Sequence, residues 1–296
     1  QRSDSSVSIA TNGSQMTATQ TVALSNDMAQ KQNVTVGFYT PVGGISSAPV
    51  STAPGLPGVG GLGGGASNPN GYQITVTLRG IGDTEQQARD ALASMAVSHS
   101  DSITADSLYL GTQIQFGGSD SQQRDASIQA QLPATLSYRL NHRAEVGSVS
   151  ATGLSGPSAD FDASVGTLNL DGTWPSVVLT SSVGSITFSG TAESLRAFSN
   201  VGSVKATLTV PKNLQADLGS NASSVDVGLT SPSASAGYDL YADTSAGTAT
   251  ITVAGTSAQG TQDSHHAHYR SANYDSASPK ALVHARSSSG SVTIHN

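Results

Sequence analysis

Cysteine is absent from all 296 residues, which excludes disulfide bonds and cysteine-ligated metal sites. Charged residues make up only 11% of the chain and aromatic residues 5%, with a formal net charge of −7. Only four lysines occur and no basic run exists, which argues against a nucleic-acid partner because phosphate binding needs clustered cations. No apolar run reaches the roughly 18 residues that a membrane-spanning helix needs, so no membrane span is expected.

The chain is instead rich in glycine, serine and threonine, and 36% of its residues are hydrophobic. A surface wetted by hydroxyls and amides rather than ions suits a protein outside the cell. Gln1 in place of Met is interpreted as the start of a mature chain after removal of a signal peptide. We therefore expect a secreted, cell-surface location, with candidate glycosylation sequons at Asn12, Asn33 and Asn221.

Residues 138–296 contain a short repeat centred on glycine. Its seven copies are separated by 19, 18, 18, 21, 24 and 43 residues. Counted from the central position (Gly, or Ser in the fifth copy), position +1 is Ser or Thr and position +2 is apolar in all seven. The copies are Val146–Val149, Val165–Leu168, Val183–Ile186, Val201–Val204, Ala222–Val225, Ala246–Ala249 and Ser289–Val292.

Apolar residues alternate with polar ones on both sides of that centre. Positions +4 and −7 are apolar in every copy, and position −5 is apolar in all but one, where His142 stands. Alternation with period 2 predicts a strand with one buried face, and a central glycine permits a sharp corner between two such strands. Each copy therefore reads as strand, corner, strand.

A unit of about 20 residues cannot bury its apolar face alone, but stacked units can form a continuous core. We therefore predict a mainly β protein with a β-solenoid, or stacked β-coil, over residues 131–296 and a polar excursion at about 255–280. The alternative is a β-sandwich with glycine-rich turns.

The C-terminal repeats also resemble a known family. The stretches Ala285–Ile294 and Tyr238–Gly247 are similar to the closing and penultimate repeats of the adhesin-like β-strand-repeat proteins of unknown function, the auto-transporter adhesin type. The resemblance covers about residues 140–296. It implies a right-handed stack of β-coils on the cell surface, and it carries over no catalytic residue. This chain has more Ser and fewer Asp at the corners than that family.

The first half predicts a small strand-rich cap. Strands are expected within residues 1–40, with a turn at Asn12-Gly13, followed by a Pro/Gly-rich linker over 41–71. Residues 72–130 read as strand, helix and strand, with the single helix at about 84–97. Asp83 is the expected N-cap residue, with Gln86 completing a capping box.

Few residues suggest chemistry. His265, His266 and His268, with Asp263 nearby, are weak metal candidates without the spacing of a structural zinc site, and a solvated loop explains them better. Asp160 and Asp162 share a strand face and resemble a glycosidase pair, although polar corners of a coil explain them equally well. No nucleophile elbow, phosphate loop or dinucleotide fingerprint occurs, so we expect neither an enzyme nor a cofactor.

The leading hypothesis is a structural or adhesive surface protein whose partner is itself, as a homopolymer, or a surface polymer. Strand addition could assemble it into a filament, with residues 5–10, including Val7 and Ile9, as the donor strand or as an intramolecular first strand. The alternative is a carbohydrate-binding or polysaccharide-degrading β-solenoid. A groove shared by the aromatic and acidic candidates would favour the alternative, and scatter would favour a structural role; these candidates are Trp174, Tyr238, Tyr241, Asp160 and Asp162.

Overall fold

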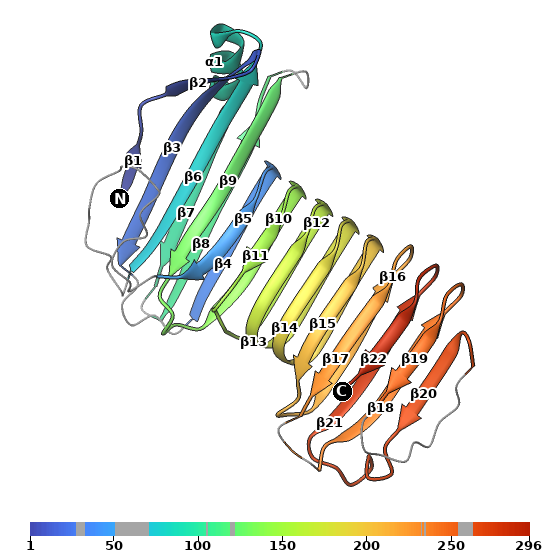
Figure 1. Cartoon of the computed structure of the whole chain (residues 1–296). Helices are drawn as coiled ribbons and strands as arrows, with labels where there is room; N and C mark the ends of the chain where they lie inside the picture. Colours follow the sequence, from blue (N-terminus) through green and yellow to red (C-terminus); the bar gives the residue numbers. More distant parts are fainter. Residues whose placement is uncertain are drawn as a thin grey trace.

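The computed structural model describes residues 1–27, 33–50, 71–104, 106–118, 122–231, 233, 235–253 and 263–296. Within these ranges the protein is mainly β, with one helix, α1 (Glu85–Ala93), and a long curled sheet (Figure 1). None of the helical structure in the described residues is long and apolar enough to cross a membrane.

The N-terminal end of the sheet is antiparallel. β2 (Ser8–Asn12) forms a hairpin with β3 (Gln15–Asp27), and Gly13 in its turn has φ +63°. β1 (Arg2–Asp4) also pairs with β3, which pairs with β6 (Gly71–Gly82), and β6 pairs with β9 (Gln123–Leu132). β7 (Met95–Ile103) is antiparallel to β8 (Ser107–Phe116). The two-residue turn is Gly13-Ser14, one residue later than the predicted Asn12-Gly13, because Asn12 still pairs with Gln15.

Apart from β20, the remaining strands pair in parallel and come in pairs joined by a corner, which we call corner units. The first is β4 (Asn33–Val42) with β5 (Ile45–Pro49), and the second is β10 (Tyr138–Val146) with β11 (Val149–Ala151). β13 and β14 are long enough to belong to two successive units each. The other strands are β12 (Ser158–Val165), β13 (Leu168–Val183), β14 (Ile186–Val201), β15 (Val204–Thr209), β16 (Leu214–Ser220), β17 (Val225–Thr230), β18 (Gly237–Thr244), β19 (Ala249–Thr252), β20 (His266–Arg270), β21 (Lys280–Ser287) and β22 (Val292–His295).

Neighbouring corner units pair position for position. Val146 lies opposite Val165, Val165 opposite Val183, and Val183 opposite Val201. Because this register is uniform, every inward side chain lies over an inward side chain of the next unit. One inward row shows the result, since all its members are buried: Phe38, His142, Phe161, Leu179, Ala197, Leu218, Ala285 and Ala242.

The last unit in the chain is not the last in space. β21 pairs with β16 on one side and β18 on the other, and β22 pairs likewise with β17 and β19. The C-terminal unit therefore sits between two units that precede it in the sequence. β20 then pairs antiparallel with β18 at the end of the sheet. Repeat spacing alone does not reveal this change of order.

The corners have a common construction. Gly147, Gly166, Gly184 and Gly202 have φ between +145° and +150°, and a Cβ at any of the last three would collide with the carbonyl oxygen of the preceding corner glycine. A buried hydroxyl supports most corners from inside; Ser199 Oγ, for example, donates to the Gly184 carbonyl at 2.7 Å. Glycine is needed here for both conformation and space.

The first corner unit corrects the predicted linker over 41–71. Residues 41–42 end β4 and residues 45–49 form β5, and between them the corner Gly43 has φ +115°. β4 and β5 pair in parallel with β10 and β11. Gly43 and Gly44 therefore form the corner between β4 and β5 and are not part of a flexible connection. Residues 51–70 of the predicted linker lie outside the described residues.

The helix is shorter than the predicted 84–97, and its cap is shifted by one residue. Thr84, not Asp83, is the N-cap; its hydroxyl accepts from the Gln87 backbone at 3.2 Å, and the Gln87 side chain accepts from the Thr84 backbone at 3.2 Å. The predicted partner Gln86 instead bonds Asp90. Helix α1 packs on β6 where Gly80 leaves room, since a Cβ there would collide with the helix backbone. The chain after Ser94 enters β7, which ends the helix.

Candidate functional surface

The outward face of the final strands carries a group of ionisable side chains. We call the outward residues of β16, β21, β18 and β20 the terminal polar face. Its strands run in the order β16, β21, β18, β20, so side chains of successive strands form rows across it. One row is Asp217, His284, Tyr241 and His268; a second is Arg286, Asp243 and His266; a third contains Asp239 and Arg270.

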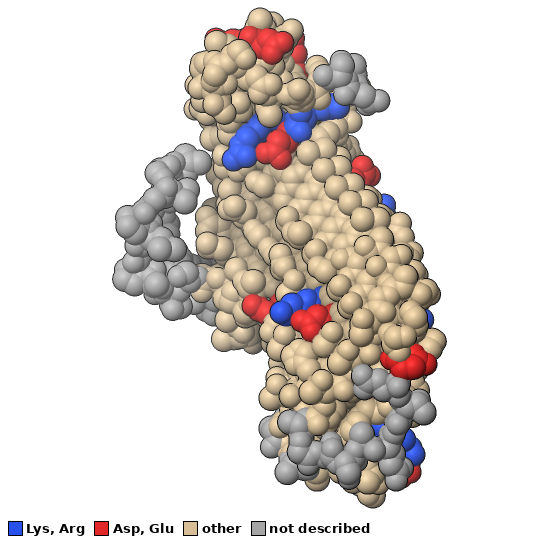
Figure 2. Space-filling view, turned by 45° about the vertical axis from the view of Figure 1, so that its right-hand side comes forward, with Lys and Arg blue, Asp and Glu red and all other residues tan. Residues whose placement is uncertain are grey.

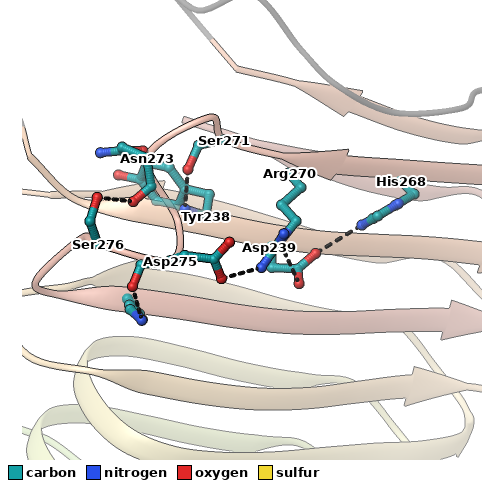
Figure 3. A network of polar contacts seen from close by, with 9 residues as sticks. Tyr238, Asp239, His268, Arg270, Ser271, Asn273, Asp275 and Ser276 are labelled. Atoms are coloured by element: carbon teal, nitrogen blue, oxygen red, sulfur yellow. Dashed lines mark hydrogen bonds and ion pairs between the residues drawn. The ribbon is translucent and has the colours of Figure 1, made fainter.

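Asp239 is the most enclosed acid of this face (Figure 3). One oxygen lies 2.8 Å from His268 Nε2 and the other 3.6 Å from Arg270 Nε. Arg270 Nη2 also contacts Asp275 at 2.6 Å. The arginine thereby connects the strand to the turn that follows it. The Ser271 hydroxyl accepts from the backbone of Tyr238 at 2.9 Å, which anchors the start of that turn.

Tyr241 lies between two imidazole rings. Its ring centroid is 4.2 Å from that of His268, with planes 10° apart, and 4.5 Å from that of His284. Burial, and then Asp239, raise the pKa of Tyr241. His268 thus stacks on the Tyr241 ring from one neighbouring strand, and His284 lies tilted against it from the other.

A hollow of about 250 Å³ opens at the corner side of the terminal polar face. Gly219 contributes no side chain between Phe198 and Arg286, which stand on either side of it in the register. Asp243 accepts a hydrogen bond from His266 Nδ1 at 2.7 Å, and this contact raises the pKa of His266. The lining residues are Phe198, Ser220, Asn221, Asp243, Thr244, Ser245, His266, Arg286, Ser287 and Ser288.

His266 and Asp243 are both well exposed, so their contact is available to solvent for polar interactions and proton exchange. A second hollow of about 270 Å³ lies beside α1 and is lined by Ile81, Gly82, Asp83, Gln87, Asp90, Gln122 and Gln123.

The three histidines proposed as weak metal ligands do not share a site. His266 and His268 lie in different outward rows: His266 bonds Asp243, and His268 bonds Asp239. His265 Nδ1 lies 3.0 Å from the Ser264 hydroxyl. Throughout the described ranges, no group of three or more His, Cys, Asp or Glu is arranged to hold a metal ion. The expectation of a solvated loop is also corrected, because His266 and His268 belong to strand β20. Residues 254–262 of the predicted excursion lie outside the described residues.

The candidate donor segment, residues 5–10, is partly in a strand of its own chain. Ile9 lies in β2 opposite Ala18, while Val7 precedes that strand and is exposed. The structure thus contains the intramolecular arrangement. Strand donation to another molecule stays a prediction. The three sequon asparagines, Asn12, Asn33 and Asn221, are exposed, and their glycosylation also stays a prediction.

The aromatic and acidic candidates do not share a groove. Trp174 is fully buried and its Nε1 donates to the Asp171 carbonyl at 3.0 Å, while Tyr238 is also buried. Asp160 and Asp162 lie on β12, five strands away from β18, which carries Tyr241. Burial and the charge of Asp162 raise the pKa of Asp160. This scatter favours the structural hypothesis over the carbohydrate alternative.

Two features escaped the sequence analysis. His142 is completely buried, and the valines preceding four corner glycines are exposed: Val146, Val165, Val183 and Val201. The valines are visible in the sequence as a repeated position, but they lie next to the corner, where strand alternation no longer tells inside from outside. His142 could have been inferred to point inward because it occupies position −5 of its repeat.

No protein-family model and no curated protein matches the sequence. Three solved structures are similar at 10% identity: a "putative cell adhesion protein" from Clostridium sporogenes (94% of this chain, 99% of that chain, TM-score 0.35), a "putative adhesin" from Bacteroides fragilis (93% and 96%, TM-score 0.37) and a "putative adhesin" from Parabacteroides distasonis (92% and 96%, TM-score 0.35). Scores this low carry no argument about function.

Proposed function

We propose that this chain is a secreted structural or adhesive protein of the cell surface, that its corner units form a β-solenoid, and that it works through contacts rather than catalysis. The observation that carries the proposal is the inward row described above. Side chains fill it from Phe38 to Ala242, so the units enclose a packed core instead of a binding cavity. Function is then left to the outer surface.

The outer surface suits contacts that tolerate changes in salt. Figure 2 shows a face that is largely uncharged, with acidic and basic side chains in small groups of mixed sign. Charged residues of the described chain often pair with a neighbour on the next strand, such as Lys205 with Asp226 at 3.5 Å and Arg79 with Asp125 at 3.0 Å. Contacts of this kind do not depend on long-range attraction, which salt screens.

A finer part of the proposal is assembly into filaments by strand addition, with residues 5–10 as the donor. Support comes from how lightly β2 is held. It makes five paired positions with β3, and four of its five residues are exposed. Releasing it costs little buried apolar surface and leaves the edge of β3 open to a strand from another copy. Identical contacts repeated head to tail would give an open filament.

Electron microscopy of the full chain beside a variant lacking residues 1–12 tests this assembly. We expect filaments of the full chain that disappear in the truncated variant, while its circular dichroism spectrum and melting curve remain those of a folded β protein. A control variant, Val7→Ser with Ile9→Ser, keeps the backbone donor and should weaken assembly without abolishing it. Single particles in all three samples would refute the filament.

The adhesive role needs a separate test. Beads coated with the full chain should adhere to one another or to the producing cells at 0.15–0.5 M salt, since the surface relies on uncharged contacts. Coated beads that stay dispersed and detached under all these conditions would refute the adhesive role, whatever the microscopy shows.

A further inference from the structure

Exposed hydrophobic side chains are concentrated on one line of the molecule. Seven large hydrophobic residues of the described chain are well exposed, and four of them are the corner valines Val146, Val165, Val183 and Val201, each 44–47% exposed. They stand opposite one another in successive corner units. Scattered exposed valines need no explanation, but a contiguous row indicates a contact surface.

A row of glycines lies beside the row of valines; we call the valine row the ridge and the glycine row the floor. Each valine is followed by a corner glycine, Gly147, Gly166, Gly184 or Gly202, which has no side chain, and then by a hydroxyl residue. The hydroxyls are paired across units, Ser148 with Thr167 at 2.9 Å and Ser185 with Ser203 at 3.0 Å. We call this ridge of valines, floor of glycines and rail of hydroxyls the valine–glycine strip.

The strip is held rigidly. Three of the corner glycines donate their N–H to the carbonyl of the next unit's valine: Gly147 to Val165 at 2.7 Å, Gly166 to Val183 at 2.8 Å and Gly184 to Val201 at 2.7 Å. From inside, Ser181 and Ser199 donate to the carbonyl oxygens of Gly166 and Gly184. A surface fixed from both sides loses little conformational entropy when it is covered.

We propose that a second copy of this chain covers the valine–glycine strip, so that two molecules associate side by side through their corners. The proposal rests on the proposed surface function, because only copies displayed together would meet in this way. A two-fold axis parallel to the stack places the ridge of each copy over the floor of the other. Val165 then meets Gly166 of the partner, and the reverse contact follows by symmetry.

Period and charge both favour a second copy as the occupant. The ridge and the floor repeat with the same spacing, one residue per strand, about 4.8 Å. A copy of the same stack matches that spacing over all four units without adjustment. Positions of the ridge, floor and rail are uncharged in all four units, so the net charge of −7 places no like charges against each other within the contact.

The area predicts a weak contact. Four strands at about 4.8 Å and three residues at about 3.3 Å give a footprint on the order of 200 Å². A stable interface buries roughly 800 Å² on each partner. The strip is therefore too small for an obligate dimer in dilute solution. It becomes effective where many copies are held close together, because tethering raises the effective concentration.

The strip also ends at a definite place. In the next three units the valine position is taken by Ala222, Ser289 and Ala246, which are small or polar. The ridge therefore stops where the terminal polar face begins. The side contact and the terminal polar face occupy different units of the same molecule.

The test compares beads densely coated with the full chain and with two matched variants. Val165→Asp with Val183→Asp places two charges on the ridge. Asn169→Asp with Thr187→Asp places two charges on exposed, neighbouring positions of the strands that follow the same two corners, away from the ridge. We expect bead clustering to fall at least tenfold with the first pair and to stay near the original level with the second. Val165→Thr with Val183→Thr keeps shape and strand propensity and should also reduce clustering.

Because the chain has no cysteine, single cysteines report the geometry directly. Beads carrying Ser164→Cys chains mixed with beads carrying Thr167→Cys chains should form mixed disulfides, since these positions face each other across the proposed axis. Ser164→Cys with Ser203→Cys, two units out of register, should not. Equal clustering of both aspartate variants, or equal disulfide yields for both cysteine pairs, would overturn the proposal. If the full chain forms filaments but the two aspartate variants cluster equally, the proposed function stands and only the side contact is refuted.

Discussion

His142 gives the sharpest prediction about stability. Its ring is completely buried, stacked between Phe38 at 4.8 Å and Phe161 at 5.0 Å, and its Nε2 lies 2.9 Å from the buried hydroxyl of Ser47. None of these three neighbours carries a charge that could offset an imidazolium. Burial therefore lowers the pKa of His142 to about 4, although the backbone of Asn141 opposes the shift slightly.

The sign and size of the effect follow from proton binding. Between pH 4 and 6.5 the unfolded chain binds a proton at His142 and the folded chain does not, so acid favours the unfolded state. With a folded pKa of about 4 against 6.5 in the unfolded chain, the free energy of unfolding falls by about 2 kcal/mol between pH 7.5 and pH 5.0. The full loss, near pH 4 and below, is roughly 3 kcal/mol.

The perturbation is His142→Phe combined with Ser47→Ala, which continues the aromatic stack and removes the hydroxyl that would lose its partner. Ser47→Ala alone is the control, because it keeps the imidazole. Guanidinium unfolding followed by circular dichroism at pH 7.5 and 5.0 gives the free energies, provided that both transitions are reversible and cooperative. The control should lose about 2 kcal/mol more than the double variant on going to pH 5.0.

Other titrating groups contribute equally to the control and to the double variant, so the difference between their losses of unfolding free energy reports His142 alone. Equal losses in the control and the double variant would refute the reasoning, since His142 would then be protonated in the folded state without penalty. A larger loss in the double variant would refute it as well.

Three further predictions follow from the corners and the terminal polar face. Gly184→Ala should destabilise the protein by at least 3 kcal/mol in thermal unfolding, because its φ of +148° and its collision with the neighbouring corner act together, whereas Gly13→Ala, which meets no atom within 4 Å, should cost about 1 kcal/mol. Ser199→Ala should cost about 1–2 kcal/mol in the same assay, since it leaves a buried carbonyl unpaired. Asp243→Asn should lower the pKa of His266 in an NMR titration, because the Asp243 carboxylate is the main cause that raises it; an unchanged titration would contradict the contact.

Local patterns predicted much of the strand structure. Alternation around the corner glycines marks residues that face inward, and Leu140, Leu195 and Val283 are all buried as the pattern requires. The one exception in that pattern, His142, is also inward, so register prevailed over polarity. The helix was found by its periodicity, but its cap was misplaced. Asp83 and Thr84 are both good caps followed three residues later by glutamine, and packing against β6 decides between them.

Long-range pairing could not be predicted from the same patterns. The corner unit around Gly43 was taken for part of a linker because Gly147, its counterpart in the next unit, follows 104 residues later and a Pro/Gly-rich tract comes between them. The position of β21 between β16 and β18 was hidden for a related reason. The units have nearly interchangeable sequences. Repeat spacing therefore gives the number of units and the positions that face inward, but not which units pair with each other.

The sequence by itself determined that the protein is mainly β, which positions alternate, where the chain turns, and that cysteine chemistry is absent. These properties depend on neighbouring residues, on composition and on the conformational freedom of glycine. Only the tertiary structure decided the order of the units, the burial of His142 between two aromatic rings and the alignment of four valines into one exposed strip. Those features arise from the register between strands far apart in the chain, and register is a property of the assembled sheet.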